Sequence, residues 1–390
     1  MAFFFWLFLF LIIYTYFGYP LVVMLWSALK PRPVAKGNGE PAVSVIISVW
    51  NEEEVIARRI QNLLEQDYPK EKMEILIGSD GSTDKTVEII RSFSDTRVVL
   101  CDFQERRGKM AVLNDLVSRA KHEVLVFADG RQTFAPNAIR ELVRNFADDT
   151  VGAASGSLVL SDGEGGTGKG VGLYWRYEKF LRRAESRIHS TAGVTGAIYA
   201  IRKALYCRIP EHIVLDDMYV PLKIVEAGRR VILDEAAVAF DKVAESSGEE
   251  SRRKARTLFG NYQIFALFPG LFLPGKSPVA VQFFSHKFLR VVAPFLLIAI
   301  FLLNIALADH AVIYFWLMTG QFVFYLMAFA GAILRHETQG FKRLVRNLCY
   351  VPYVFCLLNF SAVLGFVRFL LKDQKATWEK AKSAGDSSRR

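Results

Sequence analysis

Cysteine and histidine are scarce in this sequence, with 4 and 6 copies among 390 residues. Cys101, Cys207, Cys349 and Cys356 show no paired spacing, and the last two lie within an apolar stretch. This spacing indicates neither a disulfide framework nor a zinc site. The histidines are equally scattered, which is typical of surface or packing residues. We therefore assign no chemistry to either residue type.

Charge is missing altogether from residues 2–29. At about 1.5 Å of rise per residue, a helix of this length exceeds the ~30 Å hydrocarbon core of a bilayer. The segment also lacks the basic start, the short apolar centre and the small-residue cleavage site of a secretory signal. We therefore expect residues 1–29 to form a retained transmembrane anchor.

Long apolar runs are also missing between residues 31 and 263, which predicts a globular domain with a full core of its own. Three runs long enough to span a bilayer follow it, at roughly residues 291–307, 312–334 and 348–371. The predicted organisation is a linker at 30–42, a globular domain at 43–263, an interfacial segment at 264–276, a C-terminal transmembrane region of about three helices at 277–371, and a basic tail at 372–390.

The formal net charge is +10, and much of the basic excess flanks the apolar segments. This pattern is typical of contact with lipid headgroups on the cytoplasmic side of a plasma or inner membrane. Nucleic-acid binding is not indicated, because no basic stripe is interleaved with aromatic residues. We expect a cytoplasmic globular domain. With this domain in the cytoplasm, three later spans would put the tail outside, which conflicts with its basic residues. Either one apolar segment is re-entrant or interfacial, or the charge rule fails here.

Short apolar runs alternate with longer amphipathic stretches from Pro41 onward. This alternation predicts an α/β domain with a parallel sheet and right-handed crossovers. The predicted strands are residues 43–49, 74–78, 97–101 and 123–127, separated by helices at 53–66, around 87–90 and at 110–120.

Charged residues follow all four predicted strands. Glu52, Asp80 and Asp129 follow the first, second and fourth strands, and the third leads into the basic loop at residues 105–109. Asp80 alone has a simpler interpretation, because Asp-Gly is a turn signal and the next residues suit a helix start. Core packing gives no reason for charge at every strand end. The pattern predicts a nucleotide site, since ligands of such sheets bind beyond the carboxyl ends of the strands.

The motifs at these positions, taken in order, resemble those of family 2 glycosyltransferases. The resemblance implies the GT-A fold, a Rossmann-like nucleotide-sugar domain, here inserted between transmembrane helices. It also implies that Glu52 and Asp80 contact the base of the donor and that Lys109 lies near the nucleotide. The motifs are SVIISVWNEEE at 44–54, SDGSTDKT at 79–86, ERRGKMAVLN at 105–114 and VFADG at 126–130.

The last of these motifs is similar to the family's metal-binding Asp-x-Asp strand end. Asp129 is present, but Arg131 occupies the second acidic position. A single aspartate together with diphosphate oxygens is able to hold an octahedral ion that keeps several waters. The resemblance therefore implies Mg²⁺ or Mn²⁺ as the cofactor, with Asp129 as its ligand.

An acidic pair further along the chain supplies the implied catalytic base. LDDMYV at residues 215–220 is similar to the family motif in which the second acid, here Asp217, is the base. Asp216 stands where that motif usually has glutamate. Such a group is needed because a hydroxyl is a poor nucleophile until a positioned carboxylate takes its proton.

Two further segments resemble the acceptor side of the family's site. VTGAIYAIRK at residues 194–203 implies that Thr195 and Gly196 contact the acceptor, although a strand with one tolerated glycine explains the pattern equally well. Thr257 occupies the position where polysaccharide synthases have the tryptophan that stacks on the acceptor sugar. This replacement favours a single transfer over processive synthesis.

A basic cluster precedes Thr257. On a helix, Arg252 and Arg253 lie on the same face as Arg256, and guanidinium groups suit phosphate. We expect Arg253 and Arg256 to act in catalysis and Arg252 in donor binding. The alternative is a juxtamembrane cluster that touches lipid headgroups.

The sequence thus predicts an inverting glycosyltransferase. Its expected donor is a nucleotide sugar, with UDP as the carrier, and its expected acceptor is a lipid-linked or glycan hydroxyl at the membrane. Two alternatives stay open. One is a processive polysaccharide synthase that also translocates its polymer. The other is a catalytically silent membrane scaffold or nucleotide-sugar sensor, which Arg131 favours.

Overall fold

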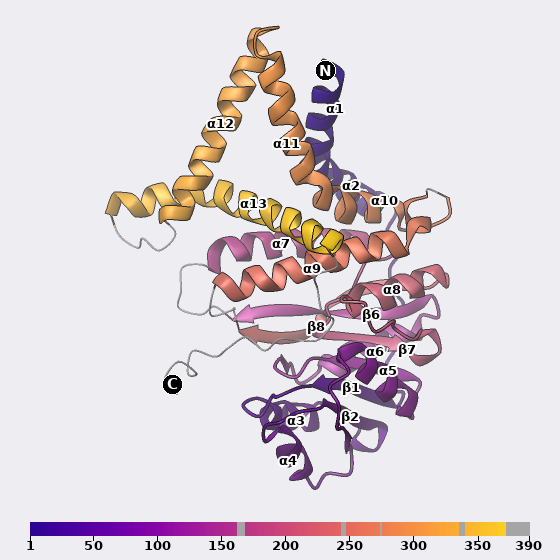
Figure 1. The fold of residues 1–390 in the computed structure, drawn as a ribbon. Coiled ribbons are helices and arrows are strands. Elements are labelled where there is room, and N and C mark those ends of the chain that lie inside the picture. Colours follow the sequence, from indigo (N-terminus) through magenta and orange to yellow (C-terminus); the bar gives the residue numbers. More distant parts are fainter. Residues whose placement is uncertain (162–167, 243–246, 274, 335–339, 372–390) are drawn as a thin grey trace, which may run out of the picture.

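The computed structural model describes residues 1–161, 168–242, 247–273, 275–334 and 340–371. For residues 161, 168–175, 242, 247–253 and 341 it describes the backbone alone. Figure 1 shows an α/β domain with long apolar helices above it. The predicted basic tail at 372–390 lies outside the described residues.

The first half of the sheet is parallel, as the sequence predicts. β1 pairs in parallel with β2 and with β4, and β2 pairs in parallel with β3. Their carboxyl ends therefore meet at one edge of the sheet. The elements are β1 (Val43–Val49), α3 (Ile56–Leu64), β2 (Met73–Asp80), α4 (Thr86–Arg91), β3 (Val98–Phe103), α5 (Lys109–Arg119) and β4 (Val124–Ala128).

The second half of the sheet is mixed. β7 pairs antiparallel with β4 and β6, and β6 pairs in parallel with β8. The full order is β3-β2-β1-β4-β7-β6-β8-β5. The added elements are β5 (Thr133–Phe134), α6 (Ala138–Arg144), β6 (Val151–Ser161), α7 (Gly168–Ile188), β7 (Ile198–Arg202), α8 (Asp216–Glu226), β8 (Arg230–Lys242) and α9 (Ser247–Leu267), with short 3-10 turns at Lys70–Lys72, Asn145–Ala147, Lys203–Leu205 and Pro269–Phe272.

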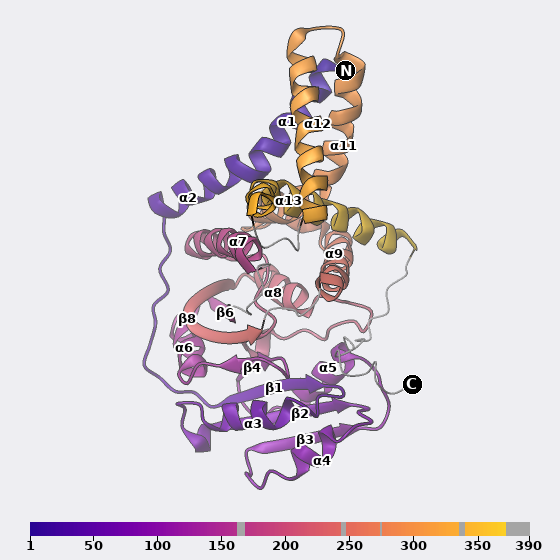
Figure 2. The same ribbon diagram turned by 90° about the vertical axis from the view of Figure 1, so that its left-hand side faces the viewer.

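The sheet is covered on both faces, which explains its apolar strands. In β1, Val45 and Ile47 belong to one buried cluster, whereas Ile46 belongs to the cluster on the opposite face. A strand buried on both sides reads as a continuous apolar run because neither face meets water. Figures 1 and 2 show α7 and α9 lying between the mixed half of the sheet and the apolar helices.

Four helical segments are long and apolar enough to cross a membrane: Ala2–Leu29, Ala280–Leu307, Val312–Ile333 and Lys342–Leu371. The second begins earlier than the sequence predicts. The first is interrupted by a π-turn, and Figure 2 shows its second half running in a new direction. The elements are α1 (Ala2–Ile13), a π-turn (Tyr14–Gly18), α2 (Tyr19–Leu29), α10 (Ala280–Gln282), a π-turn (Phe283–Phe288), α11 (Leu289–Leu307), α12 (Val312–Ile333) and α13 (Gly340–Leu371).

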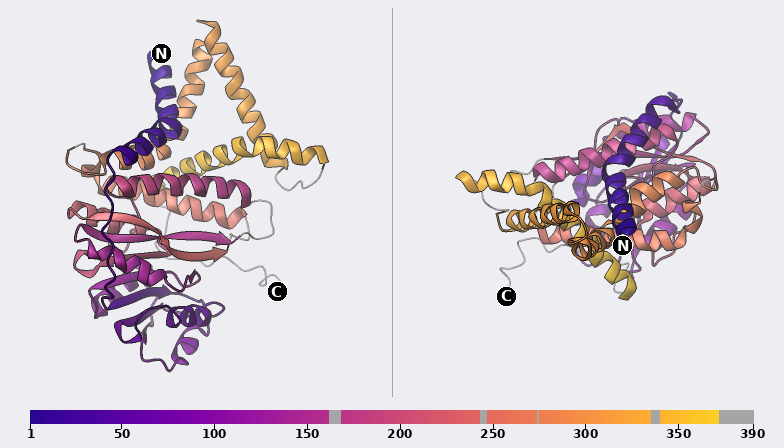
Figure 3. Two further views of the ribbon diagram at one scale, coloured as in Figure 1. Left: turned by 180° about the vertical axis from the view of Figure 1, so that it is seen from behind. Right: turned by 90° about the horizontal axis from the view of Figure 1, so that it is seen from above.

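α13 runs crosswise to α11 and α12 and follows α9 (Figures 1 and 3). The rings of Tyr262 and Phe366 lie 5.2 Å apart, and the Tyr262 hydroxyl donates to the Ala362 carbonyl at 3.2 Å. α13 therefore lies between the upright helices and the α/β domain.

Candidate active site

A pocket lies where the end of β4, the start of α5 and the start of α8 come together. We call it the carboxylate pocket. The sequence analysis predicts a functional role for all of the residues that line this pocket except Val214 and Leu215. The lining residues are Lys109, Asp129, Gly196, Val214, Leu215, Asp216, Asp217, Arg256 and Thr257.

Lys109 joins two of the carboxylates in this pocket. Its Nζ lies 3.2 Å from Asp129 Oδ1 and 3.3 Å from Asp216 Oδ2. Burial lowers the pKa of Lys109, but Asp129, Asp216 and Asp217 outweigh burial and leave that pKa raised. The ammonium is therefore charged at neutral pH and ties the end of β4 to the first turn of α8.

Asp217 is the carboxylate suited to proton transfer. Burial and the neighbouring charge of Asp216 raise its pKa to about 6, while Lys109 opposes the shift. Gly196 lies against this carboxylate, since a Cβ at that position would lie 3.3 Å from Asp217 Oδ2. The Val194 N–H also donates to the Asp217 carbonyl at 2.8 Å. The segment before β7 therefore closes tightly on the first turn of α8.

Asp80 and Glu52 lie at strand ends but do not line the carboxylate pocket. Asp80 is buried, and its carboxylate accepts the N–H of Arg107 at 2.7 Å and that of Gly108 at 2.9 Å. These bonds hold the loop that leads into Lys109. Glu52 lies beside Gly130, at the end of β4. Contact of either acid with a donor base remains a prediction.

Arg131 pairs with a residue of β8. Its guanidinium lies 3.1 Å from Asp241 Oδ2, an oxygen that also accepts from Gln132 at 2.9 Å. Among the described residues, no group of three or more His, Cys, Asp or Glu side chains is placed to hold a metal ion. Asp129 and Asp216 nevertheless converge on one cation, so the site fits a divalent ion that takes its other ligands from diphosphate and water.

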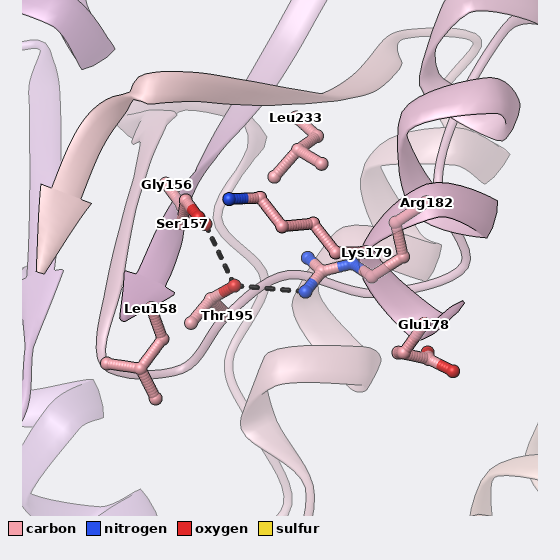
Figure 4. Close-up of a pocket in the computed structure, with 8 residues that line it drawn as sticks. All are labelled: Gly156, Ser157, Leu158, Glu178, Lys179, Arg182, Thr195 and Leu233. Atoms are coloured by element: carbon pink, nitrogen blue, oxygen red, sulfur yellow. Dashed lines mark hydrogen bonds between the residues drawn. The ribbon is translucent and has the colours of Figure 1, made fainter. Parts of the chain in front are cut away.

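Thr195 faces a second pocket, which we call the arginine pocket (Figure 4). Its hydroxyl accepts from Arg182 at 3.0 Å and donates to the Gly156 carbonyl at 2.9 Å. Sequence reasoning missed Arg182, because nothing marks it among the basic residues of an amphipathic helix. The pocket is lined by Gly156, Ser157, Leu158, Glu178, Lys179, Arg182, Thr195 and Leu233.

The remaining predicted basic residues lie on α9, which is helical as predicted. Arg256 and Thr257 line the carboxylate pocket. The side chains of Arg252 and Arg253 lie outside the described ones.

A second residue that the sequence analysis missed is Arg59, whose guanidinium carbon lies 4.1 Å from the centre of the Phe134 ring. Burial lowers its pKa to about 9, and the charge of Asp129 opposes that shift.

Comparisons with known proteins agree with this architecture. Residues 44–208 match the family model of glycosyl transferase family 2. The chain is 23% identical over 243 residues to a poly-beta-1,6-N-acetyl-D-glucosamine synthase of Staphylococcus aureus (strain COL), covering 61% of this chain and 58% of the relative. It is 33% identical over 130 residues to glycosyltransferase AglE of Haloferax volcanii, covering 33% of this chain and 42% of AglE. The chain thus spans about half the length of these curated relatives.

A solved structure has the same fold over nearly the whole chain. It is a mannosyltransferase from Pyrobaculum calidifontis in complex with GDP-Man and Mn²⁺. The two chains are 22% identical with a TM-score of 0.70, covering 95% of this chain and 100% of the other. The α/β domain described above therefore has the GT-A fold, and most of it matches the model of glycosyl transferase family 2.

Proposed function

We propose that this chain is a membrane glycosyltransferase that moves one sugar from a nucleoside-diphosphate donor to a hydroxyl of a membrane-associated acceptor. The observation that carries the proposal is the meeting of Asp129, Asp216 and Asp217 around Lys109, at the ligand-binding edge of a family 2 domain. The nucleotide sugar named with the Pyrobaculum structure supports this class of donor.

Asp217 is the proposed general base. With a pKa of about 6 it is ionised at neutral pH and still basic enough to accept a proton. It takes the acceptor hydroxyl proton as that oxygen bonds to the anomeric carbon. The bond from this carbon to the donor diphosphate breaks on the opposite face. The configuration at the anomeric centre is therefore inverted.

Cationic side chains stabilise the leaving diphosphate in this proposal. The Lys109 ammonium and the Arg256 guanidinium line the same pocket as the carboxylates. Both meet developing negative charge without reorganising, which is how fixed charges lower a barrier. Asp129 is the residue that would hold Mg²⁺ or Mn²⁺ against the diphosphate, where a divalent ion supplies further positive charge.

A processive synthase is the second candidate. The Staphylococcus relative is named as the synthase of a polymer, which favours this alternative. Thr257 favours the single transfer, because the small side chain lining the pocket offers no flat surface for a sugar ring. The products distinguish the two candidates, because one gives a ladder of lengths and the other a single species.

We also propose that the first apolar segment (Ala2–Leu29), α11 and α12 cross the bilayer while α13 lies at its surface. Figure 1 shows α13 crosswise to the other helices and next to the α/β domain. The positive charge near the α/β domain supports a cytoplasmic position for that domain and for the end of α13. The tail then begins on the side that its basic residues prefer.

A panel of labelled donors tests the proposed function. The protein, reconstituted with lipid extract, is incubated with UDP-linked and GDP-linked sugars, and the products are separated by thin-layer and size analysis. The proposal predicts one shifted lipid spot with one donor. A ladder of lengthening products would establish the processive alternative. An absence of both transfer and donor hydrolysis across the panel would favour the silent scaffold or sensor.

A further inference from the structure

The arginine pocket adjoins the carboxylate pocket through two consecutive residues. Thr195 lines the former and Gly196 lines the latter. Figure 4 shows the Lys179 and Arg182 side chains reaching into the arginine pocket from α7. A group bound there lies beside any acceptor whose hydroxyl meets Asp217.

Arg182 holds a partly buried positive charge, and among the described residues no carboxylate lies within ion-pair distance of it, although Glu178, Glu185 and Asp217 act on it from further away. Its guanidinium donates to Thr195 Oγ1 at 3.0 Å, to Ser155 Oγ at 2.9 Å and to the Gly193 carbonyl at 3.4 Å. All three acceptors are neutral. Burial lowers the pKa of Arg182, which shows the cost of keeping the charge there. An anion entering the pocket would offset that cost.

The acids near Arg182 on α7 are already paired with other groups. Glu178 points away from the pocket in Figure 4 and contacts Arg290 at 2.7 Å and His286 at 3.0 Å. Glu185 contacts His286 at 2.7 Å and accepts from the Tyr19 hydroxyl at 2.6 Å. These acids therefore leave the charge of Arg182 without a direct counter-ion.

Lys179 adds a second cation to the pocket. Its Nζ lies 3.4 Å from Glu235 Oε1, but Glu235 is also bound by Arg183 at 2.5 Å and 2.7 Å. One carboxylate thus serves two cations. Leu158 and Leu233 also line the pocket, and apolar walls of this kind strengthen the attraction for an anion.

We propose that the arginine pocket binds a phosphate group carried by the lipid acceptor, so that the acceptor is anionic and presents a nearby hydroxyl to Asp217. This inference rests on the proposed function. A guanidinium and an ammonium are the side-chain groups that bind phosphate best. The lipid source follows from position, because Leu181 and Ala184 of α7 pack against Tyr19 and Val23 of α2, part of the first apolar segment.

Binding of a lipid phosphate tests the inference directly. The full chain in phosphatidylcholine nanodiscs is titrated with labelled dioctanoyl phosphatidate, with dioctanoylglycerol as the uncharged analogue and inorganic phosphate as a competitor. Arg182→Gln should weaken phosphatidate binding about tenfold or more, because a charge-assisted contact is lost. Arg187→Gln is the matched control: it removes the same charge from an exposed residue of the same helix, outside the arginine pocket, and binding should be unchanged.

Further measurements distinguish a folding defect from a specific loss of phosphate binding. Thermal unfolding shows whether Arg182→Gln folds, and Lys179→Gln, which leaves the Thr195 contact intact, should weaken phosphatidate binding severalfold. Equal binding by the wild type and both variants would overturn the inference, as would equal affinity for dioctanoylglycerol. Inorganic phosphate that competes as well as phosphatidate would overturn the lipid source. Phosphatidate binding by a wild type that transfers no sugar would contradict the proposed function and the acceptor role, while the phosphate site in the arginine pocket would stand.

Discussion

At the scale of single residues, burial and neighbouring charges together set the pKa of Asp217 in the carboxylate pocket. Asp216 raises the pKa of Asp217 and Lys109 lowers it, with burial the largest influence. The outcome is a carboxylate that is ionised at neutral pH and titrates at about pH 6. A base of this kind is useful because its pKa lies near the pH at which it works.

The acid limb of the pH–rate profile should report this balance. Below about pH 6 Asp217 is protonated, so kcat/KM should fall about tenfold for each further pH unit. Asp216→Asn removes a like charge and should move the limb to lower pH, whereas Lys109→Met removes the opposing charge and should move it to higher pH. Profiles measured over about pH 4.5 to 8 with labelled donor check both directions. Shifts of the same sign in both variants would contradict the assignment.

Removal of divalent ions tests the role of Asp129. Transfer by EDTA-treated protein should be lost and should return with Mn²⁺ or Mg²⁺, because the diphosphate needs positive charge as it leaves. Asp129→Asn should raise the Mn²⁺ concentration needed for half-maximal rate by about tenfold or more. Asp149→Asn is the control, since Asp149 is exposed on the surface. An undiminished rate in EDTA would exclude this role.

The sequence was informative about which residues lie at the candidate active site and less informative about the direction of their side chains. Charged strand ends predicted that Asp80, Lys109 and Asp129 would lie at one edge of a parallel sheet. Spacing along the chain says nothing of side-chain direction, so it did not show that the Asp80 carboxylate faces the Arg107–Gly108 backbone. Arg182 gave no signal, because its contacts with Thr195, Ser155 and Gly193, all neutral groups, exist only in the folded protein.

At the scale of elements, α9 connects the pocket to α13. Arg256 and Thr257 line the carboxylate pocket, and Leu258 and Phe259 follow directly and pack against Gly365 of α13. On the other side, a Cβ at Gly260 would lie 2.5 Å from the Leu215 side chain, next to Asp216 and Asp217. Residues of α9 are thus held between the membrane-side helix and the segment that leads into Asp216.

Gly365→Ala should loosen this contact. The new Cβ would lie 2.8 Å from Leu258 Cβ and 3.1 Å from the Phe259 backbone nitrogen, which is unable to move freely. Overpacking of this kind costs about 1–3 kcal/mol. The thermal unfolding midpoint in nanodiscs should therefore fall, and transfer activity should fall with it.

Gly320→Ala is the matched control for this element. Gly320 also lies in an apolar helix, but a Cβ there would meet nothing within 4 Å. Alanine favours helix over glycine, so the unfolding midpoint should stay the same or rise. An equal fall of the unfolding midpoint in both variants would show that the packing of α13 on α9 does not explain the loss of stability in Gly365→Ala.

Hydrophobic periodicity predicted the ends of the strands better than the start of the second apolar segment. The four predicted strands exist within about two residues of their expected ends, because each is a short apolar run bounded by polar turns. The second apolar segment begins at Ala280 rather than near residue 291, since it starts before the charged Lys287 and Arg290. The charges made the start look polar, whereas in the structure both contact Glu178 of α7.

At the scale of the whole molecule, the arrangement of α13 determines the topology. Hydropathy alone marks α13 as a span, because composition does not show whether an apolar helix crosses a bilayer or lies along it. Its packing along α9 places it beside the α/β domain (Figure 3). We therefore favour the interfacial alternative for α13, which would keep the basic tail on the same side of the membrane as the α/β domain.

Cysteine labelling tests this topology. With the four native cysteines replaced by alanine, Leu371→Cys at the end of α13 and Asp149→Cys in the α/β domain should react with a membrane-impermeant maleimide from the same side. Asp309→Cys, between α11 and α12, should react from the opposite side. Labelling of Leu371→Cys together with Asp309→Cys would show that α13 crosses the membrane.

The central claim is that the carboxylate pocket transfers the sugar with Asp217 as base. The most direct measurement is the single-turnover transfer rate of Asp217→Asn in nanodiscs, with Asp149→Asn alongside. Our account predicts a loss of about a thousandfold for Asp217→Asn, because general base catalysis is removed while the pocket keeps its shape. Asp149→Asn should transfer at the wild-type rate. A rate for Asp217→Asn within about threefold of the wild type would contradict the account.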